Sequence, residues 1–383
     1  MRYQIKPPTL FLFLTIKPSV NLFQYLADMK TLGALTDPVY VKPESFSALD
    51  RFFLKYIKDE RDLPFAYLTL KITLTLLPAG ILLYMPFITG WVWWALAVLY
   101  FYLNNIVYKG PFGLMLHCTS HRMFFKKEYG FMNHYLPWVI APFFGHSPET
   151  YYTHHVGMHH AENNLEEDES TTMPFQRDSL RGFGKYFGTF LFMGIYHLAS
   201  YFHRKKRKKL LYRSVRGEIL FILFCIGMSL VNFKATLWVF IIPFFLFRLV
   251  AMLGNWAQHA FIDINDPGND YKNSITCINT KYNHKCWNDG YHISHHEKQA
   301  MHWTEHPVYF QKTLQKYKDN KAIVFDGIHF LHVFFWLMGK RYDLLAKHYV
   351  NIDGRFSNDE EVVDFLRTRT VKINFDELRL QTA

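Results

Sequence analysis

Hydrophobic residues in this chain gather into long stretches that polar segments separate. Residues 72–108 include no charged side chain. One membrane-crossing helix needs roughly 20 apolar residues, so this stretch is long enough for nearly two of them. Pro86 and Gly90 lie near its middle, where such residues indicate a turn. The pattern predicts a hairpin of two membrane spans, at about 65–87 and 88–108.

A second apolar region predicts another hairpin, with spans at about 218–233 and 235–253. Lys234, Pro243 and Arg248 interrupt this region, so its limits are less sharply marked. Buried helices of a soluble protein are the alternative for it. Because a charge inside a span usually faces the protein interior, we expect Arg248 to meet either a structural partner or a substrate head group.

Three other apolar segments are expected to lie at the membrane surface. Residues 131–145 contain two prolines and are short for a span, which favours an interfacial or re-entrant piece. The aromatic-rich residues 183–202 are suited to an amphipathic interfacial helix. Residues 10–15 form a short apolar run without a clear small-residue cleavage site, so we expect an interfacial segment there rather than a signal peptide.

These segments together predict an all-α integral membrane protein. It would have two transmembrane helical hairpins, hence four spans, and a cytoplasmic helical cap that carries the chemistry. We divide the chain into an N-terminal interfacial or cytoplasmic segment (1–64), a region with both hairpins (65–300) and the C-terminal cytoplasmic part of the cap (301–383). The chain shows no internal repeat, and we expect one integrated unit.

Charge predicts the orientation of the hairpins. Residues 204–209 read RKKRKK, whereas the hairpin tips hold Lys234 as their one basic residue. The positive-inside rule therefore places both termini and the middle segment in the cytoplasm. The net charge of +11 on 383 residues is better explained by anionic lipid head groups or a charged substrate carrier than by nucleic acid, and we expect no nucleic-acid partner.

The cysteines exclude two kinds of site. The four of them form no CxxC pair, and one lies inside a predicted span. Their pattern therefore indicates neither a disulfide framework nor a thiolate zinc site, as expected of a protein that faces a reducing cytoplasm.

Clustered histidines are the chemically most informative feature. On a helix, residues three and four apart share a face, and imidazole is the commonest protein metal ligand. Nine histidines are candidate ligands, too many for one ion that takes about four, so we predict a site for two metals. They are His117 and His121; His155, His159 and His160; His259; and His292, His295 and His296.

The other histidines are expected to be structural. The chain has 20 histidines, so one pair at helical spacing would mean little, but three clusters are hard to reach by chance. His154 has a poor spacing to its neighbours, and we expect it to support the site or the fold. The acidic run 162–169 is most simply a solvated loop, although one of its carboxylates could orient a ligand imidazole. The histidines without a cluster partner are His134, His146, His197, His203, His284, His302 and His306.

The clusters resemble the three histidine boxes of the membrane-bound fatty acid desaturase family, a di-iron superfamily of desaturases and hydroxylases. The boxes read HCTSH at 117–121, HVGMHH at 155–160 and HISHH at 292–296, and their order relative to the two hairpins is also similar. NWAQH at 255–259 resembles the NxxxH element of acyl-CoA desaturases. The resemblance covers roughly residues 65–300.

The resemblance implies a reaction and its cofactors. The nine histidines would hold two iron ions, and Asn255 would act on the metals through water. O₂ would be the co-substrate, and the substrate a fatty acyl chain on a lipid or on coenzyme A. The chain shows no fused cytochrome or rubredoxin-like segment. Electrons would therefore come from a separate donor of ferredoxin, rubredoxin or cytochrome b5 type.

Elementary chemistry supports a redox metal. An unactivated methylene has no acidic proton and no leaving group, so its C–H bond yields to one-electron and O₂ chemistry, for which non-haem iron is suited. Zinc has no redox chemistry, whereas imidazole ligands alone would not exclude copper. The apolar spans would also supply a tunnel for the acyl chain, because each buried CH₂ contributes about 0.8 kcal/mol.

Two alternatives stay open. The second box has three residues before its His-His pair, where the family form has two, and in this it resembles the related alkane hydroxylases. The chain could therefore insert oxygen as an alkane or fatty acid hydroxylase. A histidine-rich membrane metal transporter is the more remote alternative, since transporters hold their ligands near the bilayer midplane, whereas here the histidines lie outside the predicted spans.

Overall fold

The computed structural model describes residues 34–382, and the predicted interfacial run 10–15 lies outside them. The described chain forms two compact units. We call residues 41–256 with 372–382 the hairpin unit, and residues 34–40 with 257–371 the C-terminal unit. The three-part division expected from the sequence stays a prediction.

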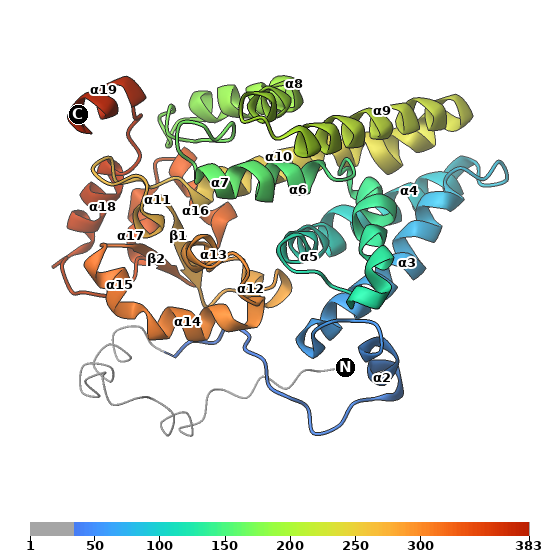
Figure 1. The fold of residues 1–383 in the computed structure, drawn as a ribbon, viewed down its shortest axis with the longest axis horizontal. Helices are drawn as coiled ribbons and strands as arrows, with labels where there is room; N and C mark the ends of the chain where they lie inside the picture. The colour runs from blue at the N-terminus through green and yellow to red at the C-terminus, as the bar shows by residue number, and fades with distance from the viewer. Residues whose placement is uncertain (1–33, 383) are drawn as a thin grey trace. The chain divides into compact units, whose positions relative to one another are not determined.

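The first hairpin of the hairpin unit is formed by α3 (Leu63–Leu82) and α4 (Gly90–Tyr102), which Figure 1 shows as neighbouring limbs. After α4 the chain continues without a break through a π-helical turn, η3 (Leu103–Tyr108), into α5 (Lys109–His121). The predicted spans thus correspond to real helices, although the second helical limb extends well past residue 108. Two short elements precede the hairpin, α2 (Ala48–Leu54) and η2 (Glu60–Asp62).

The segment between the two hairpins contains short helices and one long one. Residues predicted to form an interfacial or re-entrant piece fold as the short turns η4 (Lys127–His134), η5 (Leu136–Ile140) and η6 (Ala141–Phe144). The second histidine box follows on three consecutive elements, α6 (Thr150–His154), η7 (His155–His159) and α7 (His160–Glu162). The aromatic-rich segment is helical as predicted, within α8 (Leu180–Arg204).

The second hairpin consists of α9 (Lys208–Thr236), η8 (Leu237–Ile241) and α10 (Ile242–Gln258). Asn232 has a non-helical backbone, with φ −156° and ψ 97°. An unbroken helix would separate Glu218 from Arg248 by about 45 Å, yet their side chains form an ion pair of 2.8 Å. The chain therefore folds back at Asn232, next to the turn that the sequence predicts at Lys234.

The tips of the two hairpins lie together within the hairpin unit. The Tyr84 hydroxyl donates to Thr236 Oγ1 at 2.8 Å, and the Tyr100 hydroxyl donates to the Val239 carbonyl at 3.1 Å. Lys234 Nζ lies 3.6 Å from the centre of the Trp93 ring. Among the described residues, three helical stretches are long and apolar enough to cross a membrane. They are Glu60–Leu82, Gly90–His121 and the folded stretch Lys208–Gln258.

The C-terminal unit surrounds a pair of parallel strands, β1 (Ile275–Ile278) and β2 (Ile323–Asp326), in which Ile275 pairs with Ile323. The all-α expectation is therefore corrected: residues 34–382 are mostly helical, with one small strand ladder among them. Both strands are four-residue runs of largely buried, partly β-branched side chains, which suits a strand and is too short for a stable helix.

Short helices enclose these strands. Their core includes Tyr291, Phe310 and Tyr317 together with Leu35 from the N-terminal segment. Asp37 anchors that segment, because its carboxylate accepts the Tyr291 hydroxyl at 2.7 Å and the Asn279 amide at 2.7 Å. The helices are α11 (Asp270–Asn273), α12 (Lys281–Lys285), α13 (His292–Glu297), η9 (Trp303–Glu305), α14 (His306–Lys312), α15 (Leu314–Asp319), α16 (Phe330–Met338), α17 (Tyr342–Lys347) and α18 (Asp359–Thr368). A last helix, α19 (Phe375–Thr382), belongs to the hairpin unit.

Candidate metal centre

The first histidine box lies on the last turns of α5. His117 and His121 are four residues apart and share one face of that helix. Their ring centres are 5.2 Å apart, and His117 is buried. Because α5 continues from α4 without a break, these two imidazoles lie at the opposite end of the first hairpin from its tip.

The second box lies on a π-helical turn, which explains its unusual spacing. In an α-helix, residues five apart point about 140° away from each other, so His155 and His160 would diverge. Here the His160 amide donates to the His155 carbonyl, the i→i+5 bond of a π-turn. This turn absorbs one extra residue and brings the two imidazoles to the same side, with their Nε2 atoms 2.9 Å apart.

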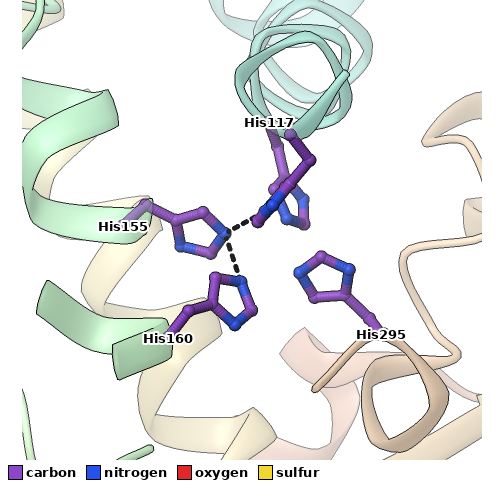
Figure 2. A group of neighbouring side chains, drawn as sticks. His117, His155, His160 and His295 are labelled. Carbon is purple, nitrogen blue, oxygen red and sulfur yellow. Dashed lines mark hydrogen bonds between the residues drawn. The ribbon is translucent and has the colours of Figure 1, made fainter. Parts of the chain in front are cut away.

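Four imidazoles converge within the hairpin unit. His155 Nε2 lies 3.1 Å from His121 Nε2, and the ligand atoms of His117, His121, His155 and His160 all lie within 4.8 Å of one another. Figure 2 shows the His117, His155 and His160 rings pointing toward one another. Two nitrogens at right angles around a metal with bonds of about 2.1 Å are about 3 Å apart. The observed contacts therefore fit cis ligands of one ion.

The charge state of these rings also suits a metal. Burial and the neighbouring imidazoles of His160 and His117 lower the pKa of His155 well below its ordinary value of 6.5. The ring is consequently neutral at physiological pH, and neutral imidazole is the form that donates a lone pair to a metal.

His159 has a carboxylate partner from the acidic run. Its Nδ1 donates to Asp168 Oδ2 at 2.7 Å, and both side chains are buried. Burial raises the pKa of Asp168, but His159 and the hydrogen bonds from Ser170 outweigh it and lower the pKa to about 2. Asp168 is therefore an ionised acceptor that holds the proton on Nδ1 and leaves Nε2 for a metal. Of the run 162–169, Asp168 is the carboxylate that orients a predicted ligand.

Asn255 is joined to the same carboxylate by a partly buried hydrogen-bond network. Its side-chain amide donates to the Tyr186 hydroxyl at 2.7 Å and to the Ser170 carbonyl at 3.1 Å. Ser170 Oγ in turn donates to Asp168 Oδ1 at 2.6 Å. The sequence identified Asn255 but not its two partners. Tyr186 could be noticed only as a member of the aromatic-rich segment, and Ser170 only as the residue after the acidic run.

The C-terminal unit holds a second convergent set. His292 and His296 lie on α13, with Nε2 atoms 3.0 Å apart, and His292 Nε2 is 3.2 Å from His259 Nε2. His259 Nδ1 donates to the Asn273 carbonyl at 2.9 Å, which leaves its Nε2 for a metal. The ligand atoms of these three residues are within 4.8 Å of one another.

The second and third boxes therefore have one geometry built in two ways. In the third box the first and last histidines are His292 and His296. They are four residues apart on the α-helix α13, and this spacing brings their rings together. In the second box His155 and His160 meet at i→i+5 across a π-turn. The extra residue of HVGMHH thus leaves the donor arrangement unchanged.

The structure places the nine predicted ligands as follows. His117, His121, His155 and His160 converge in the hairpin unit, and His259, His292 and His296 converge in the C-terminal unit. His159 is held by Asp168, and His295 lies beside His296 on α13 with ring centres 6.0 Å apart. That all nine bind metal stays a prediction.

Two further predicted residues have structural partners. Arg248, for which the sequence left a substrate head group open, pairs with Glu218 and joins the limbs of the second hairpin. His154, beside the second box, packs edge-on against the Phe190 ring of α8, with ring centres 5.6 Å apart. His284 is exposed on α12.

Comparison with known proteins agrees with this geometry. The comparisons with individual curated proteins and with solved structures find no match. The family model described as fatty acid desaturase matches residues 91–327, more than half of the chain. The match contains all three histidine boxes and the second hairpin, and its family implies an oxidoreductase. This chain therefore belongs to the fatty acid desaturase family.

Proposed function

We propose that the chain catalyses the O₂-dependent desaturation of a fatty acyl chain at a histidine-ligated di-iron centre. The convergence of Nε2 atoms within each unit carries the proposal. Four imidazoles meet in the hairpin unit and three in the C-terminal unit, with contacts of about 3 Å that suit cis metal ligands.

We propose that the nine histidines of both units together hold two iron ions. Neutral imidazole suits iron as well as zinc or copper, and the family supports iron. When bound, the ions would supply the one-electron and O₂ chemistry that an unactivated C–H bond requires. The protein's own part is to keep each Nε2 unprotonated. Asp168 does so for His159, and the Asn273 carbonyl does so for His259.

The proposed reaction balances with an external reductant. An acyl –CH₂–CH₂– unit, O₂, two electrons and two protons would give –CH=CH– and two water molecules. The electrons would come from a separate donor protein of ferredoxin, rubredoxin or cytochrome b5 type. The acyl chain would lie among the apolar helices, where each buried CH₂ contributes about 0.8 kcal/mol.

We further propose four membrane spans with the histidines on the cytoplasmic side. The fold-back at Asn232 supports two limbs within the stretch Lys208–Gln258, and the contact between Tyr84 and Thr236 supports both tips on one side. The second box, by contrast, contacts residue 207 at the base of the second hairpin, within the basic run 204–209. The positive-inside rule assigns that base to the cytoplasm.

Product analysis with labelled oxygen tests the reaction type. A host that expresses the full chain with a competent reductant should accumulate lipids lighter by two hydrogens, without label from ¹⁸O₂. Retention of one labelled oxygen atom would instead identify a hydroxylase, which the spacing of HVGMHH leaves as the second candidate. Metal binding without any change in lipid would contradict both and favour the transporter alternative.

A further inference from the structure

The basic run 204–209 contacts the second histidine box directly. The Arg207 guanidinium donates through Nη1 to the carbonyl of Gly157 at 2.7 Å. Gly157 lies in the middle of the π-turn His155–His159, between two predicted ligands. A run expected to act only in membrane topology thus has a side chain on the main chain of the candidate metal centre.

The position of Arg207 is set by the turn that ends α8. The Arg207 amide donates to the Phe202 carbonyl at 2.9 Å and the Lys206 amide to the His203 carbonyl at 3.1 Å, the two bonds of a Schellman motif. Lys206 occupies the left-handed position of that motif, with φ +56°. The chain then enters α9 immediately, so Arg207 is held between two helices.

The π-turn also packs closely on this helix junction. A Cβ atom at Gly157 would lie 3.2 Å from both Phe202 Cζ and Leu210 Cδ1, and the neighbouring Met158 is fully buried in a cluster with Leu198 and Tyr201. The main chain of the π-turn is therefore pressed against α8 and α9, and the absence of a side chain at Gly157 permits that approach.

Four ion pairs hold the same turn against the loop after the second box, including Arg204 with Glu167 at 3.5 Å. Arg204 contacts Glu169 at 3.0 Å, and Lys205 contacts Glu162 at 3.4 Å and Glu167 at 3.9 Å. Each exposed pair contributes little alone. Together they bracket Asp168, the carboxylate that orients His159.

From these contacts we propose that Arg207 is a positioning residue for the metal centre, an inference that rests on the proposed function. A π-turn is an irregular and uncommon backbone, and it alone brings His155 and His160 together. A charged donor on its central carbonyl favours that backbone, because hydrogen bonds from ionised donors are roughly twice as strong as neutral ones.

Metal titration of the full-length protein tests this role without relying on turnover. Detergent-solubilised protein is stripped of metal and titrated with Co²⁺, whose visible absorption reports its coordination. Arg207→Ala should weaken Co²⁺ binding roughly tenfold or more, the scale at which groups that orient ligands act. Arg207→Lys should recover much of the loss, because a lysine ammonium is also a charged donor. Lys208→Ala, at the exposed neighbouring position, should bind Co²⁺ like the unchanged protein.

Thermal unfolding of the metal-free variants separates positioning from a general role in folding. Positioning predicts that Arg207→Ala unfolds within a few degrees of the unchanged metal-free protein while its Co²⁺ absorption spectrum changes. Unaltered Co²⁺ affinity and spectrum in Arg207→Ala would overturn the positioning role of Arg207 and leave the proposed function standing. So would a loss of affinity that merely follows a large loss of stability. An unchanged chain that binds no Co²⁺ would overturn both this inference and the proposed function.

Discussion

His159 Nδ1 and Asp168 Oδ2 lie 2.7 Å apart in a buried contact. Asp168 also accepts the main-chain amides of Asn164 at 3.0 Å and Ser170 at 2.8 Å. These hydrogen bonds keep the carboxylate ionised and fixed, so the imidazole can present only its Nε2 to a metal. The relationship joins a residue of the second box to a loop that follows it in sequence.

The first prediction concerns this carboxylate. Asp168→Asn keeps the shape of the side chain and removes its charge, so His159 is no longer held with the proton on Nδ1. We expect metal affinity to fall about 10- to 100-fold, measured as Co²⁺ affinity and as iron per purified chain. Glu166→Gln, in the same loop and about half exposed, is the matched control. Equal metal binding by Asp168→Asn and the control would show that the contact does not support the site.

The second prediction concerns the ion pair between Glu218 and Arg248, which are nearly buried. Arg248→Ala leaves the Glu218 carboxylate without its cation, and removing one partner of a buried pair costs about 3–5 kcal/mol. The double variant Glu218→Gln with Arg248→Met should lose much less, because no buried charge remains. Thermal unfolding in detergent measures both. Equal losses in the single and double variants would show that the loss in Arg248→Ala does not come from an unpaired buried charge.

The hairpins were predictable because the bilayer imposes a length on apolar helices. The turn expected at Lys234 is found at Asn232, and the first hairpin has its turn between α3 and α4 as Pro86 and Gly90 indicate. The β1–β2 ladder was not predictable. A four-residue apolar run carries no periodicity that distinguishes a strand from part of a helix, and its partner lies 48 positions away.

The candidate ligands could be named from spacing, but their supporting residues could not. Helical spacing identifies His117 with His121 without knowledge of the fold. The sequence of the second box shows that it has one extra residue. It does not show that a π-turn accommodates this residue. The acidic run was a recognisable source of one orienting carboxylate, yet the choice of Asp168 depends on a loop in which Asn163 and Asn164 adopt left-handed backbones. Nothing in the sequence distinguishes Tyr186 from the other aromatic residues. Its role becomes visible only because the fold places it next to Asn255.

The third prediction concerns Tyr186, whose hydroxyl accepts the side-chain amide of Asn255. Tyr186→Phe removes this hydrogen bond and the one that the hydroxyl donates to the Ser170 carbonyl. At a net value of about 1 kcal/mol each, it should cost about 1–2 kcal/mol of stability, and it should lower turnover by releasing Asn255. A double-mutant cycle with Asn255→Ala measures the coupling, which we expect to be at least about 0.5 kcal/mol. Strictly additive effects on both stability and turnover would mean that the two residues act independently.

The fourth prediction tests the nine histidines one at a time. Alanine at any of them would remove a nitrogen donor from the proposed two-ion centre, so we expect turnover to be abolished and metal content to fall. His284→Ala is the control, because that side chain is exposed on α12 and close in sequence to the third box. The readouts are the lipid products of an expressing host and iron per purified chain. His159 and His292 are the most decisive positions, because each is buried and they lie in different units. Near-normal turnover in either variant would mean that the two sets of imidazoles do not serve one reaction.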